Sequence, residues 1–345
     1  MKLNRRQFTQ LAGASLATTL AAPAIAQGKT KLNMILNWRY QGPQAWFFLA
    51  QDKGYFDEVG IEMVMDQGSG SGAAVGQVAG GAYDVGFGDV NALIQLAAEK
   101  PEEAPINVYQ MYNTPPFTVG VLSSSDIKTA KDLEGRLLGG SANDGALKLF
   151  PAFASVAGID TTGVEIMNFK SNLREQMLRT EQVEGVFGYV NTIRFSAMLS
   201  GMNPDEDIRF IKFSDYGMDL YSNAMIVSKT LATENPELVK GMNWAINEGI
   251  KDTLADMDAA IDAVASREPL IDKEVEKLRL IATLQDEMNA PEIAETGLGN
   301  PDEERFTRAI DIVVEARGLP RTPDMSEVFT PDFLPPAEDR IYKLL

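Results

Sequence analysis

The sequence predicts an α/β protein of two lobes, each an open, mostly parallel sheet flanked by helices, with a helical C-terminal part. Short apolar runs alternate with helical patterns from residue 31 to residue 111, and the same alternation restarts at residue 117. The chain has 345 residues, of which 45% are hydrophobic, so it can bury a substantial core. These observations together favour two domains of ordinary size.

Strands and helices alternate regularly in the first lobe. Apolar or alternating runs predict strands at residues 31–37, 61–65, 83–87 and 106–111. Helical patterns lie between them, at residues 43–54, from the turn 68–72 to residue 81, and at 91–100. A helix after each strand is typical of an open sheet with helices on its faces.

The second lobe repeats this alternation, and the chain then becomes helical. We expect strands at residues 117–122, 136–139, 164–169, 185–187 and 208–213, and helices at 145–158, 172–180 and 191–199. A last strand at 221–227 precedes helices at 235–256, 258–266, 272–289 and 301–317. Lobe 1 would comprise residues 27–116 with 222–345, and lobe 2 residues 117–221. The Pro-rich tail after Leu319 is expected to lie extended on the surface.

Residues 1–26 carry the pattern of an export signal. Lys2, Arg5 and Arg6 form a basic region, an uncharged stretch rich in Leu, Ala and Thr follows, and residues 24–26 fit a small-x-small cleavage site. The arginine pair resembles a twin-arginine signal, although Asn4 replaces the usual Ser or Thr, so the general secretory route stays open. We therefore expect a periplasmic protein that is soluble after signal cleavage.

The composition argues against several classes of function. The chain has no His and no Cys, which excludes Ser-His-Asp or Cys-His catalysis, disulfides and metal sites built from those residues. The formal net charge of −18 disfavours nucleic acid and anionic lipid as partners. Ser69 and Ser71 do not fit a nucleophile elbow, and Asp205 with Asp207 is a pair that chance supplies among so many acids. We expect no catalytic residues, no cofactor and no metal, so the chain is predicted not to be an enzyme.

The Gly/Ser-rich turn at residues 68–73 has three interpretations. It matches G-x-G-x-x-A between a strand and a helix, with Asp89 farther along, which roughly fits a dinucleotide site. It also fits a flexible turn that caps a helix, or a turn whose bare N–H groups contact a carboxylate, sulfonate or phosphate. The first interpretation keeps open an exported dinucleotide- or flavin-dependent oxidoreductase.

Aromatic residues gather at the ends of predicted strands. They are Trp38, Tyr40, Trp46, Phe87, Tyr112, Phe187, Tyr189, Tyr216 and Tyr221. Most aromatic side chains pack in cores, but Trp38, Tyr40 and Tyr189 have polar, turn-prone neighbours. Aromatic walls with a few amides and hydroxyls are typical of a pocket for a flat small molecule.

Motifs in both halves of the chain carry a resemblance to a known family. They include Leu36-Asn37-Trp38, Gly68-Ser69-Gly70-Ser71, Gly139-Gly140-Ser141 and Gly188-Tyr189. The sequence resembles the solute-binding proteins of ABC importers grouped with thiamine-pyrimidine-precursor, riboflavin and nitrate/sulfonate/taurine binders. The resemblance implies a type II periplasmic binding protein fold and a monomer. It also implies capture of a small (hetero)aromatic metabolite, such as a thiamine pyrimidine precursor, for an ABC transporter permease in the inner membrane. A sulfonate, taurine or nitrate binder is the alternative.

The resemblance and the strand-end pattern together select a set of expected ligand contacts. They are Asn37, Trp38, Tyr40, Ser69, Gly70, Ser71, Asp89, Ser141, Asn143, Asp144, Tyr189, Asn191 and Tyr221. By the resemblance, Trp38 would stack on the ligand. Pyrimidine binders often carry an acid shortly after the second-lobe G-x-Y, whereas Asn191 follows Tyr189 here, which counts against an aminopyrimidine. Fungal relatives that make the pyrimidine use a His and a Cys-rich motif, which this chain lacks.

Overall fold

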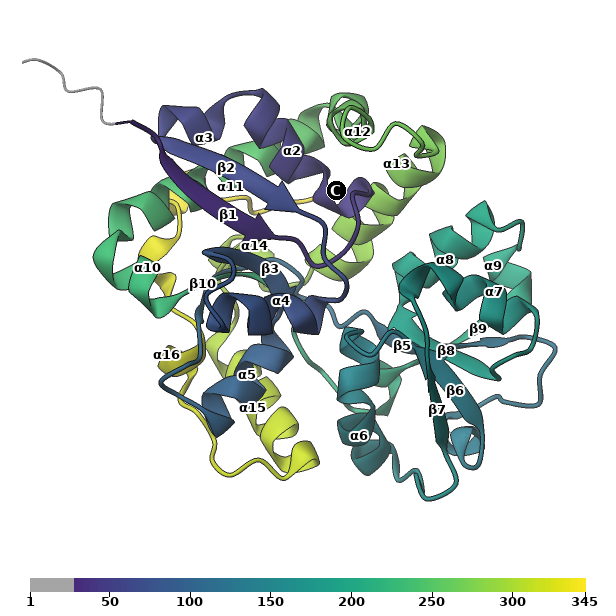
Figure 1. Cartoon of the computed structure of the whole chain (residues 1–345). Helices are drawn as coiled ribbons and strands as arrows, with labels where there is room; N and C mark the ends of the chain where they lie inside the picture. The colour runs from purple at the N-terminus through teal and green to yellow at the C-terminus, as the bar shows by residue number, and fades with distance from the viewer. Residues whose placement is uncertain (1–27) are drawn as a thin grey trace, which may run out of the picture.

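The computed structural model describes residues 28–345, which fold into two lobes that are each built on a five-stranded sheet (Figure 1). The strand order is β2-β1-β3-β10-β4 in the first sheet and β7-β6-β8-β5-β9 in the second. Helices flank both sheets, so the predicted two-lobed α/β class is confirmed. The predicted export signal lies outside the described residues, and the lobe boundaries given above stay a prediction.

The strands lie close to their expected places and differ mainly at their ends. The first sheet contains β1 (Thr30–Ile35), β2 (Ile61–Asp66), β3 (Val85–Asp89), β4 (Ile106–Gln110) and β10 (Asn223–Val227). The second contains β5 (Phe117–Leu122), β6 (Leu137–Gly140), β7 (Glu165–Asn168), β8 (Gly185–Tyr189) and β9 (Ile208–Lys212). Every residue of β3, β4, β8 and β10 is buried, as expected for strands covered on both faces.

Both sheets are mostly parallel, as predicted, and each contains one antiparallel strand. Strand β10 runs antiparallel between β3 and β4, and β5 runs antiparallel between β8 and β9. The chain leaves the first sheet at the carboxyl end of β4 and enters the second sheet as β5. After β9 it returns and enters the first sheet as β10. Each of these two strands therefore enters its sheet from the carboxyl edge of that sheet. Apolar periodicity carries no information on strand direction, so the sequence could not show which strand of each sheet runs antiparallel.

Local signals in the sequence start and stop the helices. The helices between strands are α2 (Ala45–Asp52), α3 (Tyr55–Glu58), α4 (Ser71–Ala79), α5 (Val90–Glu99), α6 (Gly145–Ala157), α7 (Arg174–Arg179), α8 (Val190–Leu199) and α9 (Pro204–Asp207). Asp89 caps α5 by accepting from the Asn91 N–H, and Asp144 caps α6 in the same way. Helix α6 ends at Gly158, whose φ of +68° is in the left-handed region that glycine tolerates.

The C-terminal helices return to lobe 1 and cover it (Figure 1). They are α10 (Lys229–Glu234), α11 (Pro236–Ala255), α12 (Met257–Ala265), α13 (Lys273–Ala282), α14 (Ile293–Thr296), α15 (Glu303–Arg317) and α16 (Met325–Val328). Helix α11 packs closely on α2, because a Cβ on Gly249 would lie 2.3 Å from the Trp46 carbonyl oxygen. No helix within residues 28–345 has the length and apolarity needed to cross a bilayer.

One expectation for the C-terminal part is wrong, and another is confirmed with a difference in helix type. The tail after Leu319 is not a surface strap, since Phe329 and Phe333 are buried and the Thr330 N–H donates to the Asn107 carbonyl at 3.1 Å. The apolar residues of the tail, which lie between prolines, pack against the open edge of β4. The helix expected at 272–289 is regular only to the end of α13 and continues as a π-helical turn, η5 (Thr283–Met288).

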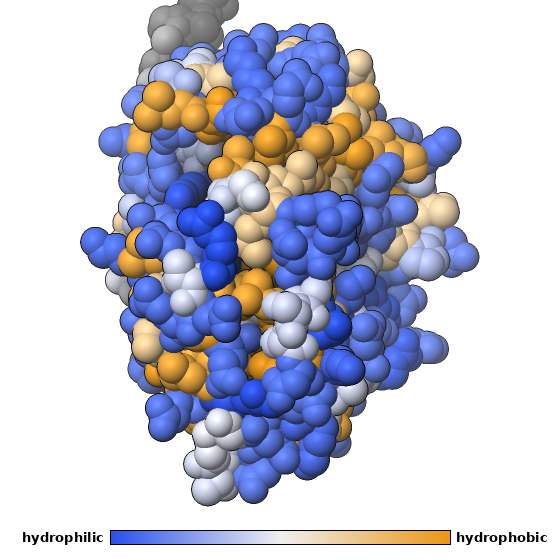
Figure 2. All heavy atoms as spheres, turned by 90° about the vertical axis from the view of Figure 1, so that its right-hand side faces the viewer, coloured by the Kyte–Doolittle hydropathy of each residue, from blue (hydrophilic) through white to orange (hydrophobic). Residues whose placement is uncertain are grey.

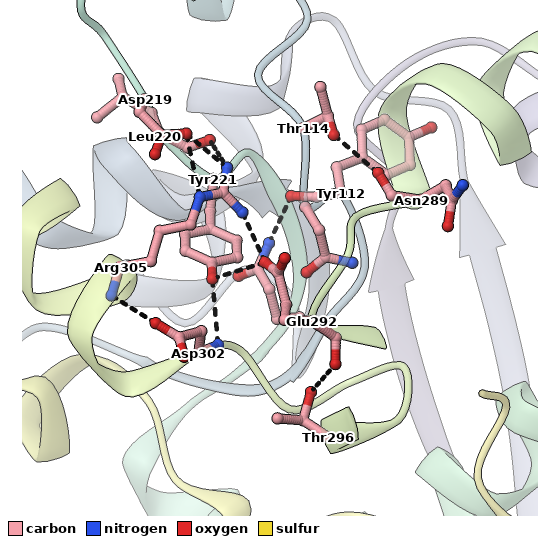
Figure 3. A network of polar contacts seen from close by, with 12 residues as sticks. Tyr112, Thr114, Asp219, Leu220, Tyr221, Asn289, Glu292, Thr296, Asp302 and Arg305 are labelled. Atoms are coloured by element: carbon pink, nitrogen blue, oxygen red, sulfur yellow. Dashed lines mark hydrogen bonds and ion pairs between the residues drawn. The ribbon is translucent and has the colours of Figure 1, made fainter. Parts of the chain in front are cut away.

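Two segments connect the lobes, one after β4 and one before β10, and both are bound to the C-terminal part (Figure 3). Thr114 on the first segment donates to the Asn289 carbonyl at 2.7 Å. On the second segment, Asp219 accepts a hydrogen bond from Arg305 of α15 at 2.8 Å. The guanidinium carbon of Arg305 lies 4.3 Å from the ring centroid of Tyr221. The two connections are therefore anchored to lobe 1, which leaves lobe 2 as the part attached through them.

Candidate functional site

A cavity that is partly open to solvent lies between the lobes at the carboxyl ends of both sheets. Open α/β sheets bind ligands at this edge. Several of the expected contacts line it: Asn37, Trp38, Gly70, Ser71, Asp144 and Tyr189. Tyr112, Arg174 and Glu287 also line it, although they were not among the expected contacts.

Tyr189, which lines the cavity, joins the two lobes. Its hydroxyl donates to Asn223 Oδ1 at 3.0 Å, and it lies 2.8 Å from Ser71 Oγ and 2.9 Å from Ser222 Oγ. Burial raises the pKa of the Tyr189 hydroxyl well above its ordinary value, so the proton stays in place. Since its three partners belong to lobe 1, the structure shows the lobes closed on each other.

The glycine-rich turn permits this close approach. Gly70 has a φ of +149°, and a Cβ there would lie 2.1 Å from the carbonyl oxygen of Asn143 in lobe 2. A Cβ on Gly145 would lie 2.8 Å from Ser71 Oγ. Ser69 and Ser141 face each other farther out, with Ser141 Oγ 3.5 Å from the Ser69 carbonyl. The turn therefore forms the seam between the lobes at the edge of the cavity.

One wall of the cavity combines an indole with two oriented amides. Trp38 is half-buried, and the guanidinium carbon of Arg174 lies 5.8 Å from its ring centroid. The Gln44 amide donates to Asn37 Oδ1 at 2.8 Å, and both side chains are buried. This bond fixes which polar atoms the amides present to the cavity.

The positive charge in the cavity is already compensated. Arg174 pairs with Glu175 at 2.8 Å and lies 3.8 Å from Asp144 Oδ2. Burial raises the pKa of the Asp144 carboxyl, while Arg174 and the N–H groups of Leu147 and Ala146 oppose that rise. An anionic ligand would thus have to compete with two carboxylates for this guanidinium.

Glu287, on the π-helical turn η5, is a cavity residue that the sequence reading missed. It is 4% exposed, and its Oε1 has no hydrogen-bond partner among the described residues. Burial is the main cause that raises the pKa of its carboxyl to about 8, and Asp286 adds to the rise while Arg279 opposes it. A signal was present, because Glu287 continues the apolar stripe of Leu280 and Leu284, where an acid is unusual.

Two of the expected contacts that do not line the cavity have hydroxyls bonded elsewhere, and their contact with a ligand stays a prediction. The Tyr40 hydroxyl donates to the Met65 carbonyl at 2.6 Å and its ring packs edge-on to Phe48. The Tyr221 hydroxyl donates to Glu292 at 3.0 Å in the connection between the lobes (Figure 3). Each hydroxyl satisfies its hydrogen bond within lobe 1, and polar neighbours along the sequence could not reveal that.

Three further expected contacts serve the seam between the lobes. Asp89 lies behind the cavity, where it lines a separate recess with Arg317, and burial raises the pKa of its carboxyl to about 7. The Asn191 amide lies 3.4 Å from Asp286 Oδ2 across the seam. Asn143 is exposed, and its backbone abuts Gly70. Ligand contact by these residues stays a prediction.

No group of three or more acidic side chains within residues 28–345 is arranged to hold a metal ion.

Comparison with known proteins gives a consistent family and fold. The family model described as NMT1/THI5 like matches residues 43–260. A Legionella pneumophila protein named 4-amino-5-hydroxymethyl-2-methylpyrimidine phosphate synthase is 23% identical over 319 residues, covering 90% of this chain and 95% of the relative. The riboflavin-binding protein RibY of Chloroflexus aurantiacus is 25% identical over 327 residues, covering 91% and 88%.

A solved structure of similar fold is the alkanesulfonate-binding protein SsuA from Xanthomonas axonopodis. It superposes with a TM-score of 0.65 at 14% identity and covers 88% of this chain and 99% of SsuA. This likeness confirms the predicted periplasmic binding protein fold.

The relatives also correct one expectation. The prediction that the chain is not an enzyme is contradicted by the Legionella relative, whose name is that of a synthase. A relative of the same name from Aspergillus parasiticus is 22% identical over 250 residues, covering 70% of this chain and 72% of the relative. The absence of His and Cys excluded two kinds of catalytic machinery, which is narrower than excluding catalysis.

Proposed function

The chain belongs to the NMT1/THI5-like family, and from this premise we propose that it captures a small, flat heteroaromatic solute between its lobes for an ABC importer. A thiamine pyrimidine precursor is the example we favour. The observation that carries the proposal is the interlobe cavity, which is lined by Trp38, Tyr112 and Tyr189 together with the oriented amides of Asn37 and Gln44. Closure of the lobes would bury such a ring on both faces.

The polar groups of the cavity favour a neutral or cationic ligand that carries N–H donors. Asp144 and Glu287 line the cavity, and the guanidinium of Arg174 is shared with Glu175. A sulfonate, taurine or nitrate ion would need donors that are not already engaged. An anion binder of the same family remains the alternative, since SsuA has this fold and is named for alkanesulfonates.

Delivery to a membrane permease from the periplasm belongs to the same proposal. The support is the closed arrangement of the lobes, which meet at Tyr189 and at the seam between Gly70 and Asn143. Release would require the lobes to separate about the two connecting segments, with one copy of the chain presenting both lobes to the permease. A dinucleotide-dependent oxidoreductase is less favoured, because the backbone of Asn143 occupies the space in front of Gly70.

Thermal unfolding of the purified chain against a ligand panel tests the proposal. The panel holds aminopyrimidines, flavins, aromatic acids, alkanesulfonates and nitrate. A ligand at a hundred times its Kd should stabilise the chain by about 2.7 kcal/mol. A panel in which no compound raises the unfolding temperature contradicts the proposal.

A pair of tryptophan variants tests the place of binding. Trp38→Ala should weaken the affinity by about 1–3 kcal/mol if the indole stacks on the ligand. Trp244→Ala is the matched control, because Trp244 packs on Tyr55 in lobe 1 and does not line the cavity. Equal affinity in the folded Trp38 variant would remove this residue from the site.

A second candidate function is synthesis of a pyrimidine, which the names of the relatives favour. The chain has neither His nor Cys, so such a reaction would depend on other side chains. The test is to incubate the chain with a small-molecule cell extract and to measure 4-amino-5-hydroxymethyl-2-methylpyrimidine phosphate by mass spectrometry. A product that forms with the native chain, and not with heat-denatured protein, supports synthesis; no product argues for binding alone.

A further inference from the structure

Glu287 differs from the other buried carboxylates of the molecule. Glu276 pairs with Arg279 at 3.0 Å, Glu175 pairs with Arg174, and Asp144 caps α6. Within residues 28–345, Oε1 of Glu287 is the one buried carboxylate oxygen without a hydrogen-bond partner. A buried polar atom left unpaired is costly, so the atom calls for a partner that enters the cavity.

The backbone of lobe 1 holds this carboxyl group in place. The Glu287 carbonyl accepts from the Thr114 N–H at 2.9 Å, which ties η5 to the first connection between the lobes. π-Helical turns occur often at functional sites, because the extra residue re-aims side chains. The Glu287 side chain is thereby set into the cavity from the lobe that carries Trp38.

Glu287 has no cationic partner among residues 28–345, and hydrogen bonds from Asn191 only partly oppose the rise of its pKa. Arg279, on α13, bonds Glu276 and also the Thr192 carbonyl at 3.2 Å. Asp286 adds negative charge from the same turn, and the phenol of Tyr112 packs nearby without charge. Across the cavity, Arg174 is engaged by Asp144 and Glu175.

These surroundings hold a proton on the carboxyl at neutral pH, since the pKa of Glu287 is raised to about 8. A protonated carboxyl presents one O–H donor and one carbonyl acceptor side by side.

We propose that Glu287 selects the ligand by pairing with a ring edge on which an amino group lies next to a ring nitrogen. The inference rests on the proposed function and names the ligand class for that cavity. The O–H donates to the ring nitrogen, and the carbonyl oxygen accepts from the amino N–H. If the proton passes to the ring, both hydrogen bonds persist as a charge-assisted pair. A sulfonate or nitrate offers acceptors only and leaves the carbonyl oxygen unpaired.

Calorimetric titration with a matched pair of ligands tests this pairing. The probes are 4-amino-5-hydroxymethyl-2-methylpyrimidine and the same compound without its amino group. We expect the wild-type chain to bind the amino compound at least about tenfold more tightly, the worth of one lost buried hydrogen bond. Its affinity should fall as the pH rises from 7 to 9, because the O–H donor is lost.

Three variants separate the donor–acceptor pair from burial alone. Glu287→Leu should lower the affinity for the amino compound by about 10- to 100-fold. Glu287→Gln keeps one donor and one acceptor, so it should retain binding within about tenfold and lose the pH dependence. Glu295→Gln, the same change at an exposed residue of α14, is the control and should bind as the wild type does. Thermal unfolding without ligand shows that each variant is folded.

The outcomes distinguish this inference from the proposed function. If no compound of the whole panel binds the wild-type chain, the proposed function fails. If a compound binds but Glu287→Leu binds it equally well, only the role of Glu287 is overturned. A wild-type chain that does not prefer the amino compound also overturns the inference.

Discussion

The two lobes have the same strand arrangement but differ in how completely their sheets are covered. In each sheet, one strand from the crossing chain runs antiparallel between two others. Lobe 1 also receives α10–α16, whereas lobe 2 leaves all four residues of its edge strand β7 exposed. The same topology therefore yields a thickly covered lobe and a thinner one.

The thinner covering of lobe 2 is also visible in the apolar side chains exposed on its surface. Figure 2 faces that side of the molecule and shows apolar atoms interrupting a largely hydrophilic surface. Large exposed apolar side chains of this lobe include Val156, Ile166, Met167, Leu173, Met198 and Leu199. Because β7 is only four residues long, its open edge offers little backbone for pairing with another chain.

The lobes also contribute different chemistry to the cavity. The polar groups of lobe 2 there are already bonded, Asp144 and Arg174 within the lobe and Tyr189 to lobe 1. Lobe 1 contributes the carboxyl oxygen of Glu287 that has no partner. We infer that lobe 1 holds the group that recognises the ligand and that lobe 2 supplies the contacts that close over it.

The largest expected effect comes from blocking closure at the seam. Gly70→Ala would place a methyl group 2.1 Å from the backbone oxygen of Asn143 at a φ of +149°. Because the obstacle is backbone, the closed arrangement should lose more than about 3 kcal/mol. Ligand affinity should fall by more than about a hundredfold, and small-angle scattering should show no compaction with ligand. Gly76→Ala, on the same turn-helix unit with open space around it, is the control.

The next effect concerns the buried acid behind the cavity. The pKa of Asp89 is raised from 3.8 to about 7, so the folded chain keeps a proton that the unfolded chain releases. The free energy of unfolding should therefore fall as the pH rises from about 4 to about 7. Asp89→Asn should flatten that slope and stabilise the chain by about 2 kcal/mol at pH 8.

Denaturant unfolding at several pH values measures this effect. Asp302→Asn, the same change at the N-cap of α15, is the control. An unchanged slope in the Asp89 variant would show that closure of the seam does not bury this acid in solution.

A smaller effect is expected from the hydroxyl that joins the lobes. Tyr189→Phe removes the bonds to Ser71, Ser222 and Asn223, so binding should weaken by about 1–2 kcal/mol. Tyr216→Phe is the control, because its hydroxyl accepts from the Ala130 N–H within lobe 2. The comparison between the lobes predicts that the control loses stability and keeps its affinity; the reverse result would contradict it.

The smallest expected effect is at a contact between the lobes outside the cavity lining. Arg39 Nη2 lies 3.4 Å from Ser171 Oγ across the lobes, a long hydrogen bond between partly exposed groups. Ser171→Ala should weaken binding by about 0.5 kcal/mol, roughly twofold, as measured by calorimetry. A tenfold loss would mean that this contact, rather than the bonds of Tyr189, controls closure.

Much of the cavity could be predicted from the sequence. Asn37, Trp38 and Tyr189 follow strands, and Ser71 and Asp144 begin helices, so their positions at the carboxyl edge follow from local pattern alone. Tyr40 and Tyr221 also follow or begin strands, and yet their hydroxyls donate to groups of lobe 1, the Met65 carbonyl and Glu292, rather than facing the cavity. Glu287 was missed because its helix gave no sign of the π-helical turn that sets it in the cavity.

The two-lobed α/β class, the helix caps and most strand positions follow from the sequence alone, since periodicity and capping depend on neighbours within a few residues. The tertiary structure decided the direction of β5 and β10, the burial of the tail at Phe329 and Phe333, and the unpaired carboxyl of Glu287. Each of these depends on which distant segment packs alongside, and burial against a distant segment leaves no local period to read.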